Sequence, residues 1–255
     1  MQRILALAFL LIMPLTFCAS GIALAQKSPR PKGRINAQEI LDKHVAATGG
    51  LEALRALQTL HAQGGLNIAP FHSTGDFHFY YKAPASDAFQ FDIISHGQSS
   101  IGHNEGTPFS KHSFHGPTGI NGVTLGILEE NCLGLIESGF DKRFTRIELV
   151  GLSEIADKWA YVLRFTPALG DRQLRYYDSE SFLMLRMDLV QRIRLQKDGP
   201  DSAYKVETFY SNYRDSGGIN FPRKITANAS DGYLVLEIHE VRTNAPVNDS
   251  VFRKN

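Results

Sequence analysis

Residues 172–196 read RQLRYYDSESFLMLRMDLVQRIRLQ, and residues 203–226 read AYKVETFYSNYRDSGGINFPRKIT. Apolar and polar residues alternate along both runs. Turn-forming clusters interrupt the pattern at Asp178–Ser181, Asp198–Asp201 and Asp215–Gly218. A two-residue period bounded by Gly, Asp and Pro is typical of antiparallel strands that bury one face. The stretch therefore predicts a meander of long strands.

The same alternation recurs on both sides of this meander. Strands are expected near 59–68, 74–82, 87–96, 146–151, 159–166, 172–178, 182–195, 203–213, 219–228 and 232–243. No run is followed by the regular helical crossover that a parallel βαβ arrangement needs. Residues 97–122 lose the period and are expected to form a long loop or a poorly formed hairpin. The predicted fold class is α+β: a single curved antiparallel sheet that forms an unclosed β-barrel, with helices covering its concave side.

Helices are expected at three places. The first begins at Asn36, whose side chain can cap it, and Glu39 can complete a capping box. Gly49 and Gly50 end this helix. A short second helix is expected over residues 51–57, and a third over residues 125–138, where apolar residues recur at helical spacing.

The N-terminus has the features of a secretory leader. Arg3 precedes an apolar stretch from Ile4 to Leu15, and Ala23 and Ala25 are small residues suited to cleavage before Gln26. The apolar stretch is too short for a good membrane span, which disfavours an uncleaved anchor. The expected organisation is a signal peptide (1–25), a flexible tether (26–34) and one domain (35–255). The expected location is the periplasm, with no stable transmembrane segment after processing.

Charge and cysteine content restrict the partners. The formal net charge is +1, which gives no reason to expect a nucleic-acid partner. Cys18 lies in the expected leader, so Cys132 is the one cysteine of the mature chain and no intramolecular disulfide can form. The apolar helical surroundings of Cys132 predict a buried position, where cysteine acts as a small hydrophobe.

Histidines gather in and beside the region without periodicity. His103, His112 and His115, with Glu105 nearby, suggest one alternative: a metal-binding protein or a metal-dependent enzyme. Their spacing fits no established zinc signature, which favours a solvent-exposed polar loop. The sequence also lacks a G-x-S-x-G elbow and the glycine patterns of phosphate-binding loops. We therefore expect no catalytic constellation and no cofactor.

Apolar rows on the strands carry the stronger hypothesis. The alternating residues from Trp159 to Phe165 share one strand face, as do those from Leu183 to Leu189. On a sheet that curls without closing, such rows line an apolar hollow that accepts an alkyl chain, at about 0.8 kcal/mol for each buried methylene. The residues expected to line it are Phe77, Phe79, Phe89, Phe91, Trp159, Tyr161, Leu163, Phe165, Leu185 and Met187. Alternatively, the same rows are ordinary core beneath the helices.

Four segments carry a family resemblance. They are AATGGLEALRALQTL (46–60), YYDSESFLMLRM (176–187), FYSNYRDSGGINFPRKI (209–225) and NAPVNDSVF (244–252). Together they resemble the LolA/LolB-like superfamily of outer-membrane lipoprotein-sorting proteins and their periplasmic relatives, over about residues 36–252. Where many relatives carry a tyrosine–aspartate–glycine and tryptophan segment, this chain has Gly102–Gly106 and no tryptophan. The resemblance implies an unclosed barrel whose hollow, lidded by helices, binds acyl chains.

Three functional hypotheses follow. The first is a non-enzymatic periplasmic carrier or receptor for a lipid or for the acyl chains of a lipoprotein, with an envelope protein as a possible partner. The second is the metal-dependent alternative that uses the histidines of residues 96–115. The third is a structural accessory module of the cell envelope, whose hollow is filled by its own side chains.

Overall fold

The structure is a computed structural model that describes residues 29–69, 73–94, 97–112, 144–168, 170–194, 201–229 and 232–253. The predicted signal peptide, the helix expected over 125–138, Cys132 and His115 lie outside these residues. The strands that precede the largest gap are β1 (Thr59–Ala69), β2 (Ser73–Lys82), β3 (Ser86–Ile93), β4 (Gly97–Asn104) and β5 (Thr107–His112). Those that follow are β6 (Phe144–Ile155), β7 (Lys158–Pro167), β8 (Gln173–Asp178), β9 (Met184–Arg194), β10 (Asp201–Ser211), β11 (Arg214–Ser216), β12 (Ile219–Phe221), β13 (Lys224–Ala229) and β14 (Gly232–Thr243).

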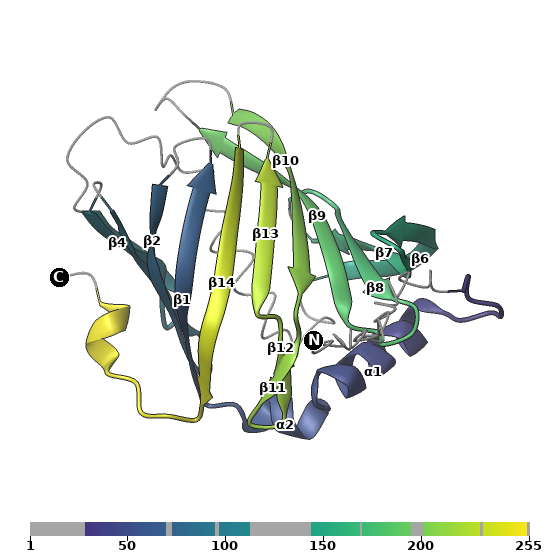
Figure 1. Ribbon diagram of the computed structural model, residues 1–255, viewed down its shortest axis with the longest axis horizontal. Coiled ribbons are helices and arrows are strands. Elements are labelled where there is room, and N and C mark those ends of the chain that lie inside the picture. Colours follow the sequence, from purple (N-terminus) through teal and green to yellow (C-terminus); the bar gives the residue numbers. More distant parts are fainter. Residues whose placement is uncertain are drawn as a thin grey trace, which may run out of the picture.

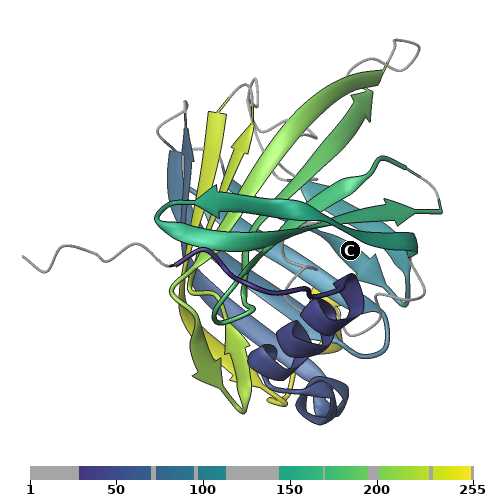
Figure 2. The ribbon, with the colours of Figure 1, turned by 90° about the vertical axis from the view of Figure 1, so that its right-hand side faces the viewer.

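One large antiparallel sheet dominates the described part of the chain. Its twelve strands run in the order β5-β4-β3-β2-β1-β14-β13-β10-β9-β8-β7-β6, and β11 and β12 form a separate hairpin. Among the described residues no ladder joins β5 to β6, so the sheet is not closed into a barrel. Figures 1 and 2 show how it twists and curls between these two edges. The predicted single, unclosed antiparallel sheet is confirmed.

Two of the predicted strand regions differ from expectation. Residues 97–112 form the β4–β5 hairpin, so the hairpin alternative holds for the described part of 97–122. The strand expected over 219–228 is split into β12 and β13. Pro222 has no N–H to donate to a ladder, and the N–H of Arg223 turns back to the carbonyl oxygen of Ser211.

Helix α1 (Ala37–Thr48) begins and ends as predicted. Asn36 Oδ1 accepts a hydrogen bond from the N–H of Glu39, and Glu39 Oε2 accepts one from the N–H of Asn36, each at 2.9 Å. At the other end Gly49 has φ +133°, and a Cβ there would lie 2.2 Å from the carbonyl oxygen of Gly218. The glycine therefore allows the corner between α1 and α2 (Leu51–Ala56) to approach the β11–β12 turn closely.

The two faces of the large sheet have different surroundings. We call inner the face that carries Phe77 and Phe79, which belong to one continuous apolar cluster that spans the sheet and includes Ile40, Leu41 and Leu54 of the helices. The opposite face is called outer. Helix α1 lies against β6 and β12, and in Figure 2 it is seen below the crossing β6 and β7 strands. The apolar face of the helices is thus joined to the inner face of the sheet.

Candidate functional site

Most of the residues predicted to line a hollow lie in the inner cluster. Seven of the ten are at most 3% exposed: Phe77, Phe79, Phe89, Phe91, Leu163, Phe165 and Met187. Aromatic rings contact one another across neighbouring strands, with Phe77 stacked on Phe89 at a centroid distance of 5.4 Å. Such contacts add to the stabilisation from buried area. The sequence pattern therefore identified an apolar surface that continues from strand to strand.

Trp159 and Tyr161 lie at the rim of this surface. Both are half-buried, and Tyr161 stacks on Phe182 at 5.9 Å. The guanidinium of Arg30 lies 5.2 Å above the ring of Trp159. Arg30 belongs to the segment that was expected to be a flexible tether, so this part of the segment contacts the sheet.

Leu185 corrects the predicted row from Leu183 to Leu189. It lies on the outer face, against a small second cluster of Ala160, Val162 and Tyr176. The β8–β9 ladder has a register shift between Tyr176 and Tyr177, which pair with Arg186 and Met184. The extra residue at this bulge is Leu185. A bulge interrupts strict alternation, so Met184 and Met187 face inward and Leu185 does not.

A buried cation on the inner face was missed by the sequence analysis. Arg175 is 3% exposed, and its guanidinium lies 4.4 Å from the ring of Phe165 and 5.2 Å from that of Phe144. Its Nη2 donates to Gln173 Oε1 at 2.8 Å. Arg175 lies two residues before Tyr177, which belongs to the inner cluster. Side chains two residues apart on a strand lie on the same face, so the sequence period itself places Arg175 on the inner face.

Helix α1 is attached to the sheet by polar contacts as well as apolar ones. His44 Nδ1 lies 2.9 Å from the carbonyl oxygen of Phe182, and the His44 ring contacts that of Tyr177 at 4.8 Å. Asn220 Nδ2 donates to the carbonyl oxygen of Ala47 at 2.8 Å. The helix is therefore held at two points, the β8–β9 turn and the β11–β12 hairpin.

The two predicted metal ligands that the structure describes, His103 and His112, are far apart along the strands. In the β4–β5 ladder His103 pairs with Pro108 and His112 pairs with Ser99. These two pairs are four residues apart, which corresponds to roughly 13 Å along the strands. His103 Nδ1 lies 3.0 Å from Asp87 Oδ1 instead. Burial raises the pKa of Asp87, and the nearby imidazole partly opposes this. In the described ranges no group of three or more His, Cys, Asp or Glu side chains is suited to holding a metal.

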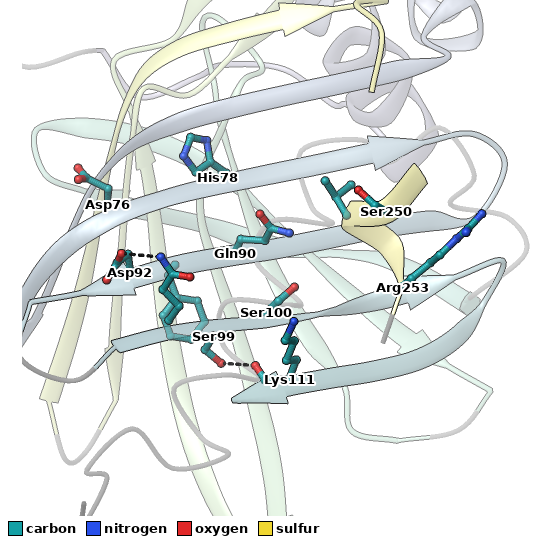
Figure 3. A pocket seen from close by; sticks show the side chains of 12 residues that line it. Asp76, His78, Gln90, Asp92, Ser99, Ser100, Lys111, Ser250 and Arg253 are labelled. Atoms are coloured by element: carbon teal, nitrogen blue, oxygen red, sulfur yellow. Dashed lines mark hydrogen bonds between the residues drawn. The ribbon is translucent and has the colours of Figure 1, made fainter. Parts of the chain in front are cut away.

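A polar pocket of about 530 Å³ lies on the outer face. Its floor is formed by β2, β3, β4 and β5, and one wall is the short 3₁₀ helix η2 (Asp249–Phe252), which lies against β3 and β4. Figure 3 shows Asp76 and Asp92 at one end, Arg253 at the other, and Ser100 and Lys111 between them. None of the ten residues predicted for the hollow contributes a polar group to this pocket; Phe91 alone reaches it.

A histidine pair borders the same pocket. His78 lines it, and His78 Nδ1 lies 3.0 Å from Nε2 of His61. His61 also stacks on Tyr80 at a centroid distance of 4.5 Å. Burial, followed by the neighbouring His78, lowers the pKa of His61. A hydrogen bond between two imidazoles needs at least one of them to be neutral, which agrees with this direction.

With this geometry established, comparison with known proteins identifies the fold. No protein-family model matches the sequence, and no match was found among curated proteins. A solved LolA superfamily protein from Nitrosomonas europaea is similar at a TM-score of 0.51 and 16% identity, over 87% of this chain and 99% of its own. A DUF1329 family protein from Desulfovibrio piger reaches a TM-score of 0.56 at 13% identity, over 85% and 97%.

A third solved structure is similar to this chain. A domain from Vibrio parahaemolyticus, assigned to outer-membrane lipoprotein sorting, is similar at a TM-score of 0.51 and 10% identity, over 85% of this chain and 95% of its own. The chain therefore has a LolA/LolB-like fold, as the sequence resemblance implied. Likeness at this level of identity establishes the fold, and function has to be argued from the residues. Across the described ranges, no helix has the length and apolar character needed to span a membrane.

Proposed function

We propose that this protein is a non-enzymatic periplasmic carrier or receptor that holds a lipid, or the acyl chains of a lipoprotein, against the inner face of its sheet. In this proposal α1 and α2 cover the concave side as a lid. One observation carries it: the inner apolar cluster is continuous from the sheet to Ile40, Leu41 and Leu54 of the helices. An acyl chain that separates them would keep apolar surface on both sides.

The energetics favour such an exchange. A chain of sixteen carbons offers roughly 12 kcal/mol when it is fully buried. Opening the lid breaks the two polar attachments at His44 and Asn220, each worth about 1 kcal/mol. It also exposes Ile40 and Leu41, at about 1.5–3 kcal/mol each. The gain exceeds the cost of these contacts, so an acyl chain can compete with the helices for the inner face.

The test combines two measurements on the same protein. Native mass spectrometry of the protein purified from its own periplasm is expected to show a bound lipid. Titration with a fluorescent fatty acid is expected to saturate at one site. If both measurements show no lipid, the proposal is wrong.

Variants of α1 test the lid. Replacing both His44 and Asn220 with alanine removes the polar attachments and is expected to increase the rate at which the fluorescent fatty acid binds. Asp42→Ala, an exposed change on the same helix, is the matched control and is expected to leave that rate unchanged. Equal rates in all three proteins would exclude α1 as the lid.

The third sequence hypothesis, a ligand-free accessory module, has an observation in its favour. The aromatic residues of the inner face are almost completely buried by the protein itself, with Phe77 and Phe89 each 1% exposed. This reading predicts that fatty acid does not bind at any concentration and that added lipid leaves the melting temperature unchanged. A lipid-dependent increase in melting temperature therefore favours the carrier.

The processing of the chain is part of the same proposal. A signal peptide over residues 1–25 would direct export, residues 26–34 would link it to the domain of residues 35–255, and an envelope protein would receive the cargo. Sequencing the N-terminus of the periplasmic protein is expected to begin at Gln26. A mature protein that retains residues 1–25 would contradict this organisation.

A further inference from the structure

The outer-face pocket carries an arrangement of charge that the apolar inner face does not use. We propose that it binds a small zwitterion with an ammonium and a phosphate group, the ammonium beside Asp76 and Asp92 and the phosphate beside Lys111, on the side of the pocket that leads to Arg253. The pocket lies on the side of the sheet opposite the inner cluster. The proposal is therefore independent of the lipid-carrier function.

The acidic end is set by the strand register. Asp76 on β2 and Asp92 on β3 are directly opposite each other in the ladder. Their Cβ atoms are then about 5 Å apart, and like charges in this position repel. Asp92 Oδ2 accepts a hydrogen bond from the amide of Gln98 at 2.9 Å, and an amide carries no charge that would compensate the carboxylate. An ammonium group between the two carboxylates would offset the repulsion.

The basic end is built from two parts of the chain that are far apart in sequence. Lys111 comes from β5 and Arg253 follows η2. Arg253 lies close enough to Asp249 for its positive charge to help lower the pKa of that carboxyl, after the larger effect of Lys82. η2 is anchored by the buried side chain of Phe252, which is 2% exposed, and Lys82 forms an exposed ion pair with Asp249 at its start.

A neutral donor lies between the two ends. Ser100 is directly opposite Lys111 in the β4–β5 ladder, and its Oγ is buried without a hydrogen-bond partner among the described residues. Figure 3 shows the Ser100 side chain within the pocket, near Lys111. A phosphate group has enough oxygens to accept from this hydroxyl and from the Lys111 ammonium together. Arg253 adds a second positive charge further along the pocket, which favours the doubly charged phosphate over a carboxylate.

The separation of the ends fits one small molecule. Lys111 is two strands from Asp92 and two residues further along, which corresponds to roughly 10 Å across the strands and 7 Å along them. The long side chain of Lys111 can shorten this gap from the basic end. The volume of about 530 Å³ admits such a ligand together with water. Phosphoethanolamine has this chemistry, either as a free molecule or as the headgroup of a phospholipid.

Calorimetric titration of the full protein with free phosphoethanolamine tests the proposal. Binding is expected, with inorganic phosphate and ethanolamine each at least tenfold weaker. The double variant Asp76→Asn/Asp92→Asn and the single variant Lys111→Gln are each expected to weaken binding by tenfold or more. Lys205→Gln, an exposed change at a distance on β10, is the matched control and is expected to bind like the wild type. All of these positions are exposed, so folding is checked simply by the melting temperature.

A vesicle arm separates the two sources of the ligand. Co-sedimentation with phosphatidylglycerol vesicles that contain phosphatidylethanolamine, against vesicles without it, reports on the headgroup. Binding of the free molecule alone, or of the vesicles alone, supports the site and assigns its source. Absence of binding in both arms, equal binding of inorganic phosphate, or binding that the Asp76, Asp92 and Lys111 variants leave unchanged would overturn the proposal.

Discussion

The inner and outer faces of the sheet are made from alternate residues of the same strands, yet they are stabilised differently. The inner face is one apolar cluster in which rings such as Phe77 and Phe89 stack directly. The outer face is held by polar networks. Tyr176 donates to Asp188 Oδ2 at 3.0 Å, and Arg186 joins Asp188 to Glu207. A continuous apolar face tolerates little change in volume, whereas a polar face depends on specific partners.

The outer network also shows how neighbouring charges shift titration. Burial, followed by the negative charge and hydrogen bond of Asp188, raises the pKa of Tyr176 to about 12. The tyrosine therefore remains a neutral donor throughout the physiological range. Ionic and neutral groups on this face support one another without joining the apolar cluster.

The largest contrast between the faces is expected at two adjacent residues of β2. Phe79 is buried in the inner cluster, whereas Tyr80 lies on the outer face and stacks on His61. Phe79→Ala is expected to lower the free energy of unfolding by about 3–5 kcal/mol, because it removes a buried ring and leaves a cavity. Tyr80→Ala is expected to cost about 1 kcal/mol, mainly the lost ring contact. Denaturant unfolding measures both, and equal losses would contradict the assignment of faces.

Two adjacent glycines of β1 provide the next contrast. A Cβ on Gly64 would lie 1.9 Å from the backbone oxygen of Glu237, whereas on Gly65 its nearest neighbour would be a His239 ring atom at 3.8 Å. Gly64→Ala is expected to cost about 2–3 kcal/mol, since backbone atoms of β14 would have to move. Gly65→Ala is expected to stay within about 0.5 kcal/mol of the wild type. If Gly64→Ala lowered the free energy of unfolding no more than Gly65→Ala does, the bulge beside Gly64 would have to relax.

The sequence predicted the inner face far better than the outer one. A two-residue period identifies which side chains point inward. It placed six buried residues on the inner face: Phe77, Phe79, Phe89, Phe91, Leu163 and Phe165. It misplaced Leu185 because a bulge has no signature in the period. The outer pocket could not be predicted from the sequence, for a different reason. It places Asp76, Lys111 and Arg253 around one pocket through strand order and through the return of the C-terminal segment, which alternation does not encode.

Acid stability is expected to depend on Asp178, a buried carboxylate on the outer face. Burial alone would raise its pKa, but hydrogen bonds from Lys158 Nζ and from the N–H of Glu180 lower it below the usual value. A depressed pKa stabilises the folded protein above the unfolded pKa of about 3.9, and this stabilisation is lost as the pH falls through the folded pKa. Asp178→Ala is expected to cost about 1.5–2 kcal/mol at pH 7.

The pH profile provides the control for Asp178. Unfolding free energies measured from pH 7 to pH 2 are expected to fall less steeply below pH 4 for Asp178→Ala than for the wild type. Asp87 is expected to have the opposite pH dependence, because burial raises its pKa in the folded protein. Its contribution to stability is therefore greater at low pH and decreases as the pH rises. If the free energy of unfolding fell equally steeply with pH in the wild type and in Asp178→Ala, Asp178 would not contribute to acid unfolding.

The smallest effect is expected where η2 meets the sheet. Lys82 and Asp249 form an ion pair whose side chains are 42% and 55% exposed, and exposed pairs contribute little because water and salt screen them. Lys82→Ala is therefore expected to leave the melting temperature at the wild-type value, in low salt and in high salt. Phe252→Ala, in contrast, removes the buried anchor of the same helix and is expected to loosen the pocket wall. If Lys82→Ala were the more damaging change, η2 would be held by charge. The pocket wall would then differ in kind from the inner face, where buried rings hold the elements together.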